Sequence, residues 1–333
     1  MSMELNTILQ GDCIESMQKL PDSIINTTVT SPPYYGLRDY GEDGQIGQEE
    51  TPQQYIDKMV EVFAQVRRIT RDDGSLWLNL GDSYAGSGKG AYADGVVRLG
   101  EKSNKQSTNT GSATGTFKKT NVQILKPKNL MGIPWRVAMA LQEDGWYLRQ
   151  DIIWHKPNPM PESVTDRCTK SHEYIFLLTK NPDYYFDYEA IRERSVSKMD
   201  REHLSPVGGK KDPRKPGSYS GNAPVNDGFR NKRSVWSVPI SAKNYDGAHF
   251  AVYPEDLIRP CILAGAPEEG VVFDPFFGAG TTGVVAVKNN RKYIGCELNP
   301  EYIEIAKKRL EPIHLQQENK EKAEGIINNY FEF

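Results

Sequence analysis

The sequence predicts an α/β protein built on a doubly wound, mainly parallel sheet. Short runs rich in β-branched and aromatic residues recur along its 333 residues, as they do in buried strands. Segments with apolar residues at helical spacing separate several of these runs, and strands that alternate with helices form parallel sheets covered on both faces. The composition, 38% hydrophobic and 26% charged, is that of a globular protein and excludes a fibrous or wholly disordered chain.

The individual elements follow from these patterns. In residues 52–69, Tyr55, Met59 and Val62 recur on one face, which predicts a helix packed on the sheet. Comparable spacing predicts further helices at residues 134–141, 254–263 and 300–310. The predicted strands are residues 24–30, 75–80, 150–154, 174–179, 271–274 and 292–297.

Two stretches without apolar periodicity carry much of the positive charge. Residues 86–128 hold eight Lys and Arg against two acidic residues, and residues 198–233 hold nine against four, although the whole chain has a net charge of -3. Both stretches are rich in Gly, Ser and Asn, which predicts long loops. Composition leaves two interpretations open: flexible solvated insertions, or loops that become ordered on a polyanion.

The cysteines and the hydropathy pattern indicate the compartment. The four cysteines lie far apart without a CxxC pair, so neither a disulfide framework nor a thiolate zinc site is expected. The chain has no run of about 18 apolar residues, and its N-terminus lacks the pattern of a secretion signal. We therefore expect a cytoplasmic protein that needs no metal.

The sharpest motif lies near the C-terminus. Residues 271–310 read as a strand, a glycine-rich turn, a helix, a strand ending in an acid, and another helix, which is half of a doubly wound fold. The glycines of residues 278–283 spell GxGxxG, which on its own would indicate a dinucleotide. Asp274, directly before the turn, would repel a phosphate but suit a cationic cofactor such as S-adenosylmethionine. Glu297 can accept hydrogen bonds from both ribose hydroxyls, although the two acids could also merely cap the helices that follow them.

A second motif, TSPPY at residues 30–34, follows a predicted strand. Pro32 and Pro33 fix the backbone and remove two N–H donors, so carbonyl groups at the strand end can point unpaired into a site. Such a corner suits a flipped-out nucleobase, whose amino group would donate to Ser31 and the Pro32 carbonyl while its ring stacks on Tyr34. Taken alone, Pro-Pro-Tyr is also typical of a loop or a polyproline ligand.

TSPPY and DPFFGAGTT together resemble the motifs of DNA amino-methyltransferases, which use S-adenosylmethionine to methylate cytosine N4 or adenine N6. Because TSPPY comes first and a long basic stretch separates the motifs, the chain resembles the circularly permuted beta class. The resemblance implies a Rossmann-like sheet assembled from both ends of the chain. It also implies four parts: a catalytic half at residues 1–182, a target-recognition region at 183–245, a cofactor-binding half at 246–312 and a tail at 313–333.

The resemblance assigns residues to the site as well. The implied catalytic motif is Ser31, Pro32, Pro33 and Tyr34, and Asp82 and Tyr84 are further candidates beside the target-base pocket. The implied cofactor-binding residues are Asp12, Cys13, His249, Phe250, Tyr253, Pro254, Asp274, Phe276, Gly278, Gly280, Thr281, Thr282, Glu297 and Leu298. The basic stretches supply candidate DNA contacts at Lys118, Lys119, Lys210, Lys211, Arg214, Lys215, Arg230 and Arg233.

The expected partner is double-stranded DNA; a homodimer and a companion restriction endonuclease stay open. An exocyclic amino group is a poor nucleophile because its lone pair is delocalised, and accepting its hydrogens at Ser31 and Pro32 would release that pair for in-line attack. Within the family, an acidic residue in the place of Ser31 mostly accompanies adenine, so the sequence favours cytosine N4, with adenine N6 as the alternative. His155 is an alternative general base that this chemistry does not require.

Three other functions share part of the pattern. A nicotinamide-dependent oxidoreductase would share GxGxxG but leaves TSPPY and the acid at Asp274 unexplained. An RNA or protein methyltransferase would share the pocket chemistry, but its cofactor motif usually comes first. A DNA-binding module without catalysis would explain the basic loops but not two complete motifs.

Overall fold

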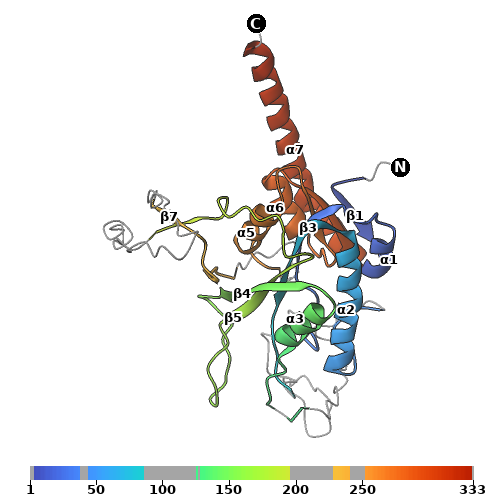
Figure 1. Ribbon diagram of the computed structural model, residues 1–333, viewed down its shortest axis with the longest axis vertical. Coiled ribbons are helices and arrows are strands. Elements are labelled where there is room, and N and C mark those ends of the chain that lie inside the picture. Colours follow the sequence, from blue (N-terminus) through green and yellow to red (C-terminus); the bar gives the residue numbers. More distant parts are fainter. Residues whose placement is uncertain are drawn as a thin grey trace, which may run out of the picture.

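The computed structural model describes residues 4–37, 44–85, 125–126, 128–195, 228–240 and 252–331. Most of the strands and helices in these ranges alternate along the chain, as the sequence predicts (Figure 1). In chain order they are β1 (Thr7–Gln10), α1 (Cys13–Gln18), β2 (Ile25–Thr30), α2 (Pro52–Ile69), β3 (Thr70–Leu80), α3 (Ile133–Glu143), β4 (Tyr147–His155), β5 (His172–Thr179), β6 (Glu193–Arg194), β7 (Phe229–Arg230), β8 (Val235–Ser237), α5 (Glu255–Gly265), β9 (Val271–Asp274), α6 (Thr281–Lys288), β10 (Lys292–Glu297) and α7 (Pro300–Phe331).

In the described part of the chain, eight strands form one sheet in the order β1-β10-β9-β2-β3-β5-β4-β8. Strands β1, β10, β9, β2 and β3 are parallel neighbours, and β5 is antiparallel to both β3 and β4. The predicted doubly wound, mainly parallel sheet is therefore confirmed. The strands β9 and β10 from the C-terminal part lie between β1 and β2 from the N-terminal part, so both ends of the chain build one sheet.

Helices cover both faces of this sheet, and each face has its own apolar core. Buried side chains of α1, α2 and α3 pack together on one face, and those of α5, α6 and α7 pack on the other. Figure 1 shows α2 and α3 together, apart from α5 and α6. No helix among the described residues is long and apolar enough to cross a membrane.

The helix boundaries have local causes. Helix α2 begins at Pro52 because Thr51 and Gln54 form a capping box, in which the Thr51 hydroxyl accepts from Gln54 N at 3.2 Å and Gln54 Oε1 accepts from Thr51 N at 3.0 Å. Helix α7 differs from the prediction, because it continues through Pro312 to Phe331, across the boundary expected at the tail. Strand β3 begins at Thr70 rather than at the predicted residue 75, directly after α2.

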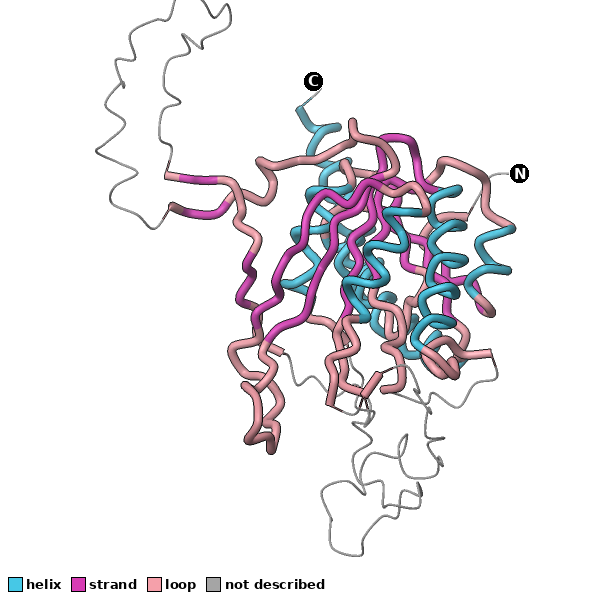
Figure 2. The backbone as a smooth tube through the Cα atoms, turned by 60° about the horizontal axis from the view of Figure 1, so that its bottom comes forward, coloured by secondary structure: helices cyan, strands magenta, loops and turns pink. Residues whose placement is uncertain are grey.

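The described parts of the expected recognition region, residues 183–245, belong to two different sheets. Strand β8 joins the main sheet beside β4, and Trp236 is buried in the core that also contains side chains of α5 and α6. Strands β6 and β7 pair with each other instead, and stand away from the sheet as an arm (Figure 2). The described parts of this region thus serve both the sheet and a projecting arm, while most of the two basic stretches lies outside the described residues.

The carboxyl ends of the parallel strands meet at one edge of the sheet. The segments that follow β1, β10, β9, β2 and β3 therefore converge there. In open α/β sheets ligands bind at this edge, outside the strand ends. Both sequence motifs, TSPPY after β2 and DPFFGAGTT at the end of β9, are thereby placed side by side.

Candidate functional site

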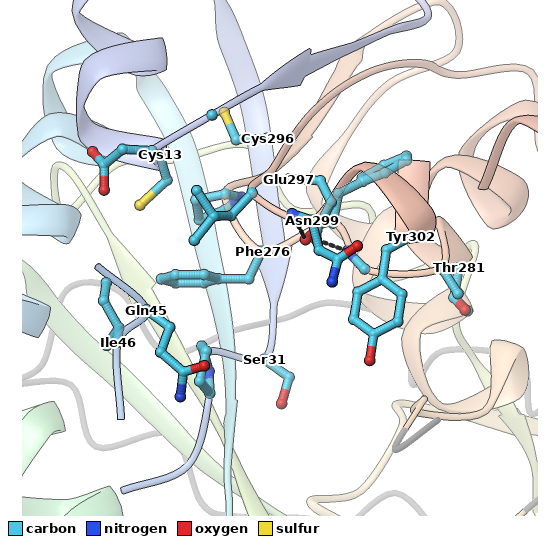
Figure 3. Close-up of a pocket in the computed structure, with 18 of the residues that line it drawn as sticks. Cys13, Ser31, Gln45, Ile46, Phe276, Thr281, Cys296, Glu297, Asn299 and Tyr302 are labelled. Carbon is cyan, nitrogen blue, oxygen red and sulfur yellow. Dashed lines mark hydrogen bonds between the residues drawn. The ribbon is translucent and has the colours of Figure 1, made fainter. Parts of the chain in front are cut away.

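A cavity at this edge brings the two motifs together (Figure 3). In the figure, Ser31 and Gln45 lie on one side of the cavity, and Glu297 and Asn299 lie on the other. The lining combines segments that are far apart in the sequence: Gly11, Asp12, Cys13, Ser31, Pro33, Gly44, Gln45, Ile46, Val252, Tyr253, Pro275, Phe276, Phe277, Gly278, Ala279, Thr281, Cys296, Glu297, Leu298, Asn299 and Tyr302.

The glycine turn between β9 and α6 forms one wall. Gly278 has φ +52° and Gly280 has φ +78°, backbone conformations that side chains rarely allow. A Cβ atom at Gly280 would also lie 2.9 Å from Cβ of Ala306, so the residue lets α7 approach the turn closely. Gly278 lines the cavity, whereas Gly280 does not and acts as the N-cap of α6.

Glu297, at the end of β10, is the acid of the cavity. Its Oε2 accepts from Gly278 N at 2.7 Å and its Oε1 accepts from Asn299 N at 2.8 Å, so the backbone orients the carboxylate. Burial raises the pKa of this half-buried carboxyl, an effect that the two backbone N–H donors partly offset. An acid held in this way can accept further hydrogen bonds from a ligand in the cavity.

Asp274, at the end of β9, is placed differently from the sequence expectation, because its side chain is 1% exposed and does not line the cavity. Its Oδ1 accepts from Thr30 Oγ1 at 2.6 Å and from Phe276 N at 3.0 Å. Its Oδ2 accepts from Thr282 Oγ1 at 2.6 Å and from Tyr253 Oη at 3.0 Å. Burial raises the pKa of Asp274 despite these four donors. The carboxylate thus joins β2, β9, α6 and Tyr253 from behind the cavity wall.

The segment after β1 supplies the opposite wall. Asp12 is the N-cap of α1, with Oδ1 accepting from Ile14 N at 2.8 Å and Glu15 N at 3.1 Å. Cys13 lines the cavity as well, and burial raises the pKa of its thiol to about 12. The thiol therefore stays protonated near neutral pH and contributes an apolar surface rather than a nucleophile.

The TSPPY motif continues β2 into the cavity. Ser31 and Pro33 line it, and the Pro33 carbonyl accepts from Tyr55 Oη at 2.9 Å, which fixes the motif to α2. Within the described residues the Pro32 carbonyl accepts no hydrogen bond. Tyr34 does not line this cavity, because its hydroxyl turns toward the start of β5 and donates to Glu173 Oε2 at 2.8 Å.

The sequence motifs do not include part of the lining. Gln45 and Ile46 follow TSPPY by about a dozen residues, and Asn299 and Tyr302 follow Glu297. The asparagine and tyrosine could have been found from NPEY, which follows the acid after one residue. No comparable signal marks Gln45 and Ile46, because only the return of the chain over the cavity gives them a role.

Other predicted site residues lie elsewhere. Asp82 accepts from Gly132 N and Ile133 N at 3.1 Å each, so it holds the start of α3 rather than facing the cavity. The Arg167 guanidinium lies 4.2 Å from the ring centre of Tyr84. His155 Nδ1 lies 3.1 Å from Ser237 Oγ, away from the lining. Pro32, Pro254 and Thr282 adjoin lining residues without lining the cavity themselves.

The candidate DNA contacts are only partly described. Arg230 and Arg233 both donate to Oε1 of Glu193, at 2.9 and 3.2 Å, at the base of the β6–β7 arm. His249 and Phe250 lie outside the described residues, as do Lys118, Lys119, Lys210, Lys211, Arg214 and Lys215.

Comparisons with known proteins agree on one family. The profile of a family described as DNA methylase, N6_N4_Mtase, matches residues 25–308. The Type II methyltransferase M.Cfr9I of Citrobacter freundii is 45% identical over 311 residues, which cover 93% of this chain and 89% of that protein. The fold is similar to PvuII DNA methyltransferase (cytosine-N4-specific), with a TM-score of 0.61, 18% identity, and coverage of 95% of this chain and 93% of that one. It is also similar to a DNA modification methylase from Thermus thermophilus complexed with S-adenosyl-L-methionine, with a TM-score of 0.53, 20% identity, and coverage of 92% and 95%.

Proposed function

This chain belongs to the N6_N4_Mtase family of DNA methylases, and on that premise we propose that it transfers a methyl group from S-adenosylmethionine to the N4 amino group of cytosine in double-stranded DNA. The observation that carries the proposal is the cavity lined both by Ser31 and Pro33 of TSPPY and by Gly278 and Glu297 of the cofactor motif and the strand after it. A methyl donor and an amino acceptor bound by the two motifs would meet there.

The lining residues fit S-adenosylmethionine. Glu297 would accept hydrogen bonds from the ribose hydroxyls, because its carboxylate is already fixed by Gly278 N and Asn299 N. Ile46, Phe276 and Cys13 form an apolar wall suited to the flat face of an adenine. The turn at residues 275–279 would hold the amino acid end, with Asp274 supporting it from behind. When bound, the cofactor supplies a methyl group on a positively charged sulfur, so no metal or general base is needed to activate it.

On the target side, the chain acts on the amino group of the base. Ser31 Oγ and the Pro32 carbonyl would accept its two hydrogens, which draws the nitrogen toward tetrahedral geometry and frees its lone pair. Serine is too weak a base to remove a proton first, so proton loss follows methyl transfer. The ring would stack on Tyr34, which requires the base to leave the duplex.

Cytosine is the proposed target because Ser31 stands where an acidic residue mostly accompanies adenine in this family. The fold relative named as cytosine-N4-specific supports the same choice. The cations of the basic stretches and of the β6–β7 arm would contact DNA phosphates. Similarity to Type II methyltransferases further supports a place in a restriction-modification system with a companion endonuclease.

Mass spectrometry of nucleosides tests the reaction. DNA amplified in vitro, which carries no methylation, is incubated with the purified protein and S-adenosylmethionine, then digested to nucleosides. We expect N4-methylcytidine in its deoxy form, absent from reactions with Ser31→Ala. Detection of N6-methyladenine alone would mean that the target is adenine instead of cytosine and would leave the mechanism intact. Detection of neither methylated nucleoside would contradict the proposed function.

A further inference from the structure

We propose that Glu173, paired with Lys156, is a positioning residue that fixes the ring of Tyr34 before the target base arrives. Neither residue belongs to the two sequence motifs. The inference rests on the proposed function, because it assigns Tyr34 a stacking role, and it adds a set of residues from β3, β5 and the end of β4 that would control that role.

The hydroxyl of Tyr34 is held by polar side chains of β3 and β5. It donates to Glu173 Oε2 at 2.8 Å and lies 3.4 Å from Asn79 Oδ1. Asn79 is itself fixed, because its Nδ2 donates to the Tyr174 carbonyl at 3.0 Å. Ser31 Oγ lies 3.5 Å from the same hydroxyl, so the residue that would accept an amino hydrogen is in contact with this network.

The ring of Tyr34 is fixed as well as its hydroxyl. A Cβ atom at Gly81, directly after β3, would lie 2.6 Å from Cε2 of Tyr34, which places the ring directly on the Gly81 backbone. Strands β3 and β5 are antiparallel neighbours with Leu80 opposite Tyr174, so Gly81 and Glu173 follow at the same end of the ladder. Gly81 therefore sets the position of the ring, and Glu173 sets the direction of its hydroxyl.

Lys156 compensates the charge of Glu173. The side chains of Glu173 and Lys156 are each 15% exposed, and Lys156 Nζ donates to Glu173 Oε1. An unpaired carboxylate at such a depth would be costly, whereas the ammonium group offsets that cost and leaves Oε2 for Tyr34. The Lys156 ammonium also lies 4.2 Å from the ring centre of Trp154, which restricts its own position.

A ring held in advance loses no rotational freedom when the base stacks on it, so the methyl acceptor is aligned at lower cost. The effect should fall on the rate of methyl transfer and not on cofactor affinity, because Glu173 and Lys156 do not line the cavity described above. A variant that slows methyl transfer but keeps its cofactor affinity has therefore lost the positioning of Tyr34 and not its fold.

The test is a double-mutant cycle between Tyr34→Phe and Glu173→Gln. Single-turnover methyl incorporation into amplified DNA is measured for the wild type, both single variants and the double variant, with S-adenosylhomocysteine affinity measured by calorimetry. We expect each single change to slow transfer about tenfold, the double variant to be no slower than Tyr34→Phe, and the affinity to stay unchanged. Tyr34→Phe removes only the hydroxyl oxygen and so breaks the same hydrogen bond. Its rate therefore tests the proposal even where a Glu173 variant is unstable.

Glu162→Gln is the matched control, since Glu162 lies in the connection between β4 and β5 and pairs with Arg167 at 2.8 Å, as Glu173 pairs with Lys156. It should transfer methyl groups at the wild-type rate. Equal slowing by Glu173→Gln in the wild-type and Tyr34→Phe backgrounds, or slowing no greater than that of the control, would overturn the proposal. A wild-type protein that methylates no DNA would instead overturn the proposed function.

Discussion

The cofactor half and the target half of the site hold their acidic side chains in opposite ways. In the cofactor half, Asp274 and Glu297 accept hydrogen bonds from hydroxyl groups and backbone N–H groups, all of them neutral donors. In the target half, Glu173 pairs instead with the ammonium group of Lys156. The neutral donors of the cofactor half leave negative charge at the site, which suits a cationic ligand. The ion pair of the target half suits an uncharged base that is attached to the anionic phosphate backbone of DNA.

The difference has a consequence for ionisation. Burial raises the pKa values of both Asp274 and Glu297, because no cation among their described hydrogen-bond partners offsets the loss of water. A positively charged ligand beside them would favour the ionised forms, so binding and ionisation would support each other. The target half needs no such ligand, because its cations belong to the chain.

Removing the acid of the cofactor half should change ligand binding most strongly. Glu297→Ala deletes the acceptor proposed for the ribose hydroxyls, and we expect the dissociation constant of S-adenosylhomocysteine to rise by about 30-fold, as for hydrogen bonds to a charged group. Because the pKa of Glu297 is raised from 4.5, wild-type affinity should fall as the pH drops through that raised value and the carboxylate becomes protonated. Isothermal titration calorimetry at a series of pH values measures both effects.

Two further variants complete this measurement. Gly278→Val should lower affinity comparably, because Gly278 has φ +52° and lines the cavity. Glu301→Ala is the control, since this exposed acid of the first turn of α7 lies four residues from Glu297 and does not line the cavity. Wild-type affinity in Glu297→Ala and Gly278→Val would contradict the proposed cofactor site.

Asp274→Asn is expected to act on stability. An amide has one acceptor oxygen and would turn N–H donors toward a site where four donors converge, so we expect a loss of about 2 kcal/mol in the free energy of unfolding. Urea denaturation of both proteins measures it.

The pH dependence of that loss has a defined sign. The folded-state pKa of Asp274 is raised above 3.8, so its contribution to stability is full below 3.8 and declines as the pH rises through the folded-state value. The difference between wild type and Asp274→Asn should therefore be smaller at roughly pH 8 than at roughly pH 4. A difference that grows with pH would mean that the folded-state pKa lies below 3.8, so that the four donors outweigh the loss of water on burial.

The sequence predicts the fold well because its signals are local. Helix α2 has the bounds that the sequence predicts, since apolar spacing, Thr51 and Pro52 all lie within or directly beside the segment. The two motifs are recognisable for the same reason, because each is a continuous run of residues. The antiparallel direction of β5 was not predicted, because strand direction is decided by its pairing with β3 and β4 and not by its composition.

The orientation and support of site residues depend on contacts between distant segments. Asp274 was expected to face the cofactor, but Thr30, 244 residues away in sequence, is one of the donors that turn it inward. Glu173 lies 139 residues from Tyr34, and no pattern in HEYIFLLT marks it as part of the site. Such roles follow from strand order, which brings β2, β3 and β5 together.

A weaker effect tests whether the β6–β7 arm adds uncompensated cations to the target half. One carboxylate, Glu193, accepts from both Arg230 and Arg233, so the cluster keeps a positive charge, and the Arg233 side chain is 64% exposed. If Arg233 contacts one phosphate, Arg233→Gln should reduce the slope of log affinity against log salt by about 0.9. Fluorescence anisotropy of a labelled duplex in increasing KCl measures the slope.

Arg259→Gln on α5 is the control for the arm, because the Arg259 side chain is 55% exposed and pairs with Asp256. It should leave the salt slope at the wild-type value, since a cation outside the DNA surface displaces no counterions when the duplex binds. An unchanged slope in Arg233→Gln, or an equal decrease in the control, would mean that Arg233 does not contact DNA. The cations that serve the target half would then lie in the pocket and not in the arm.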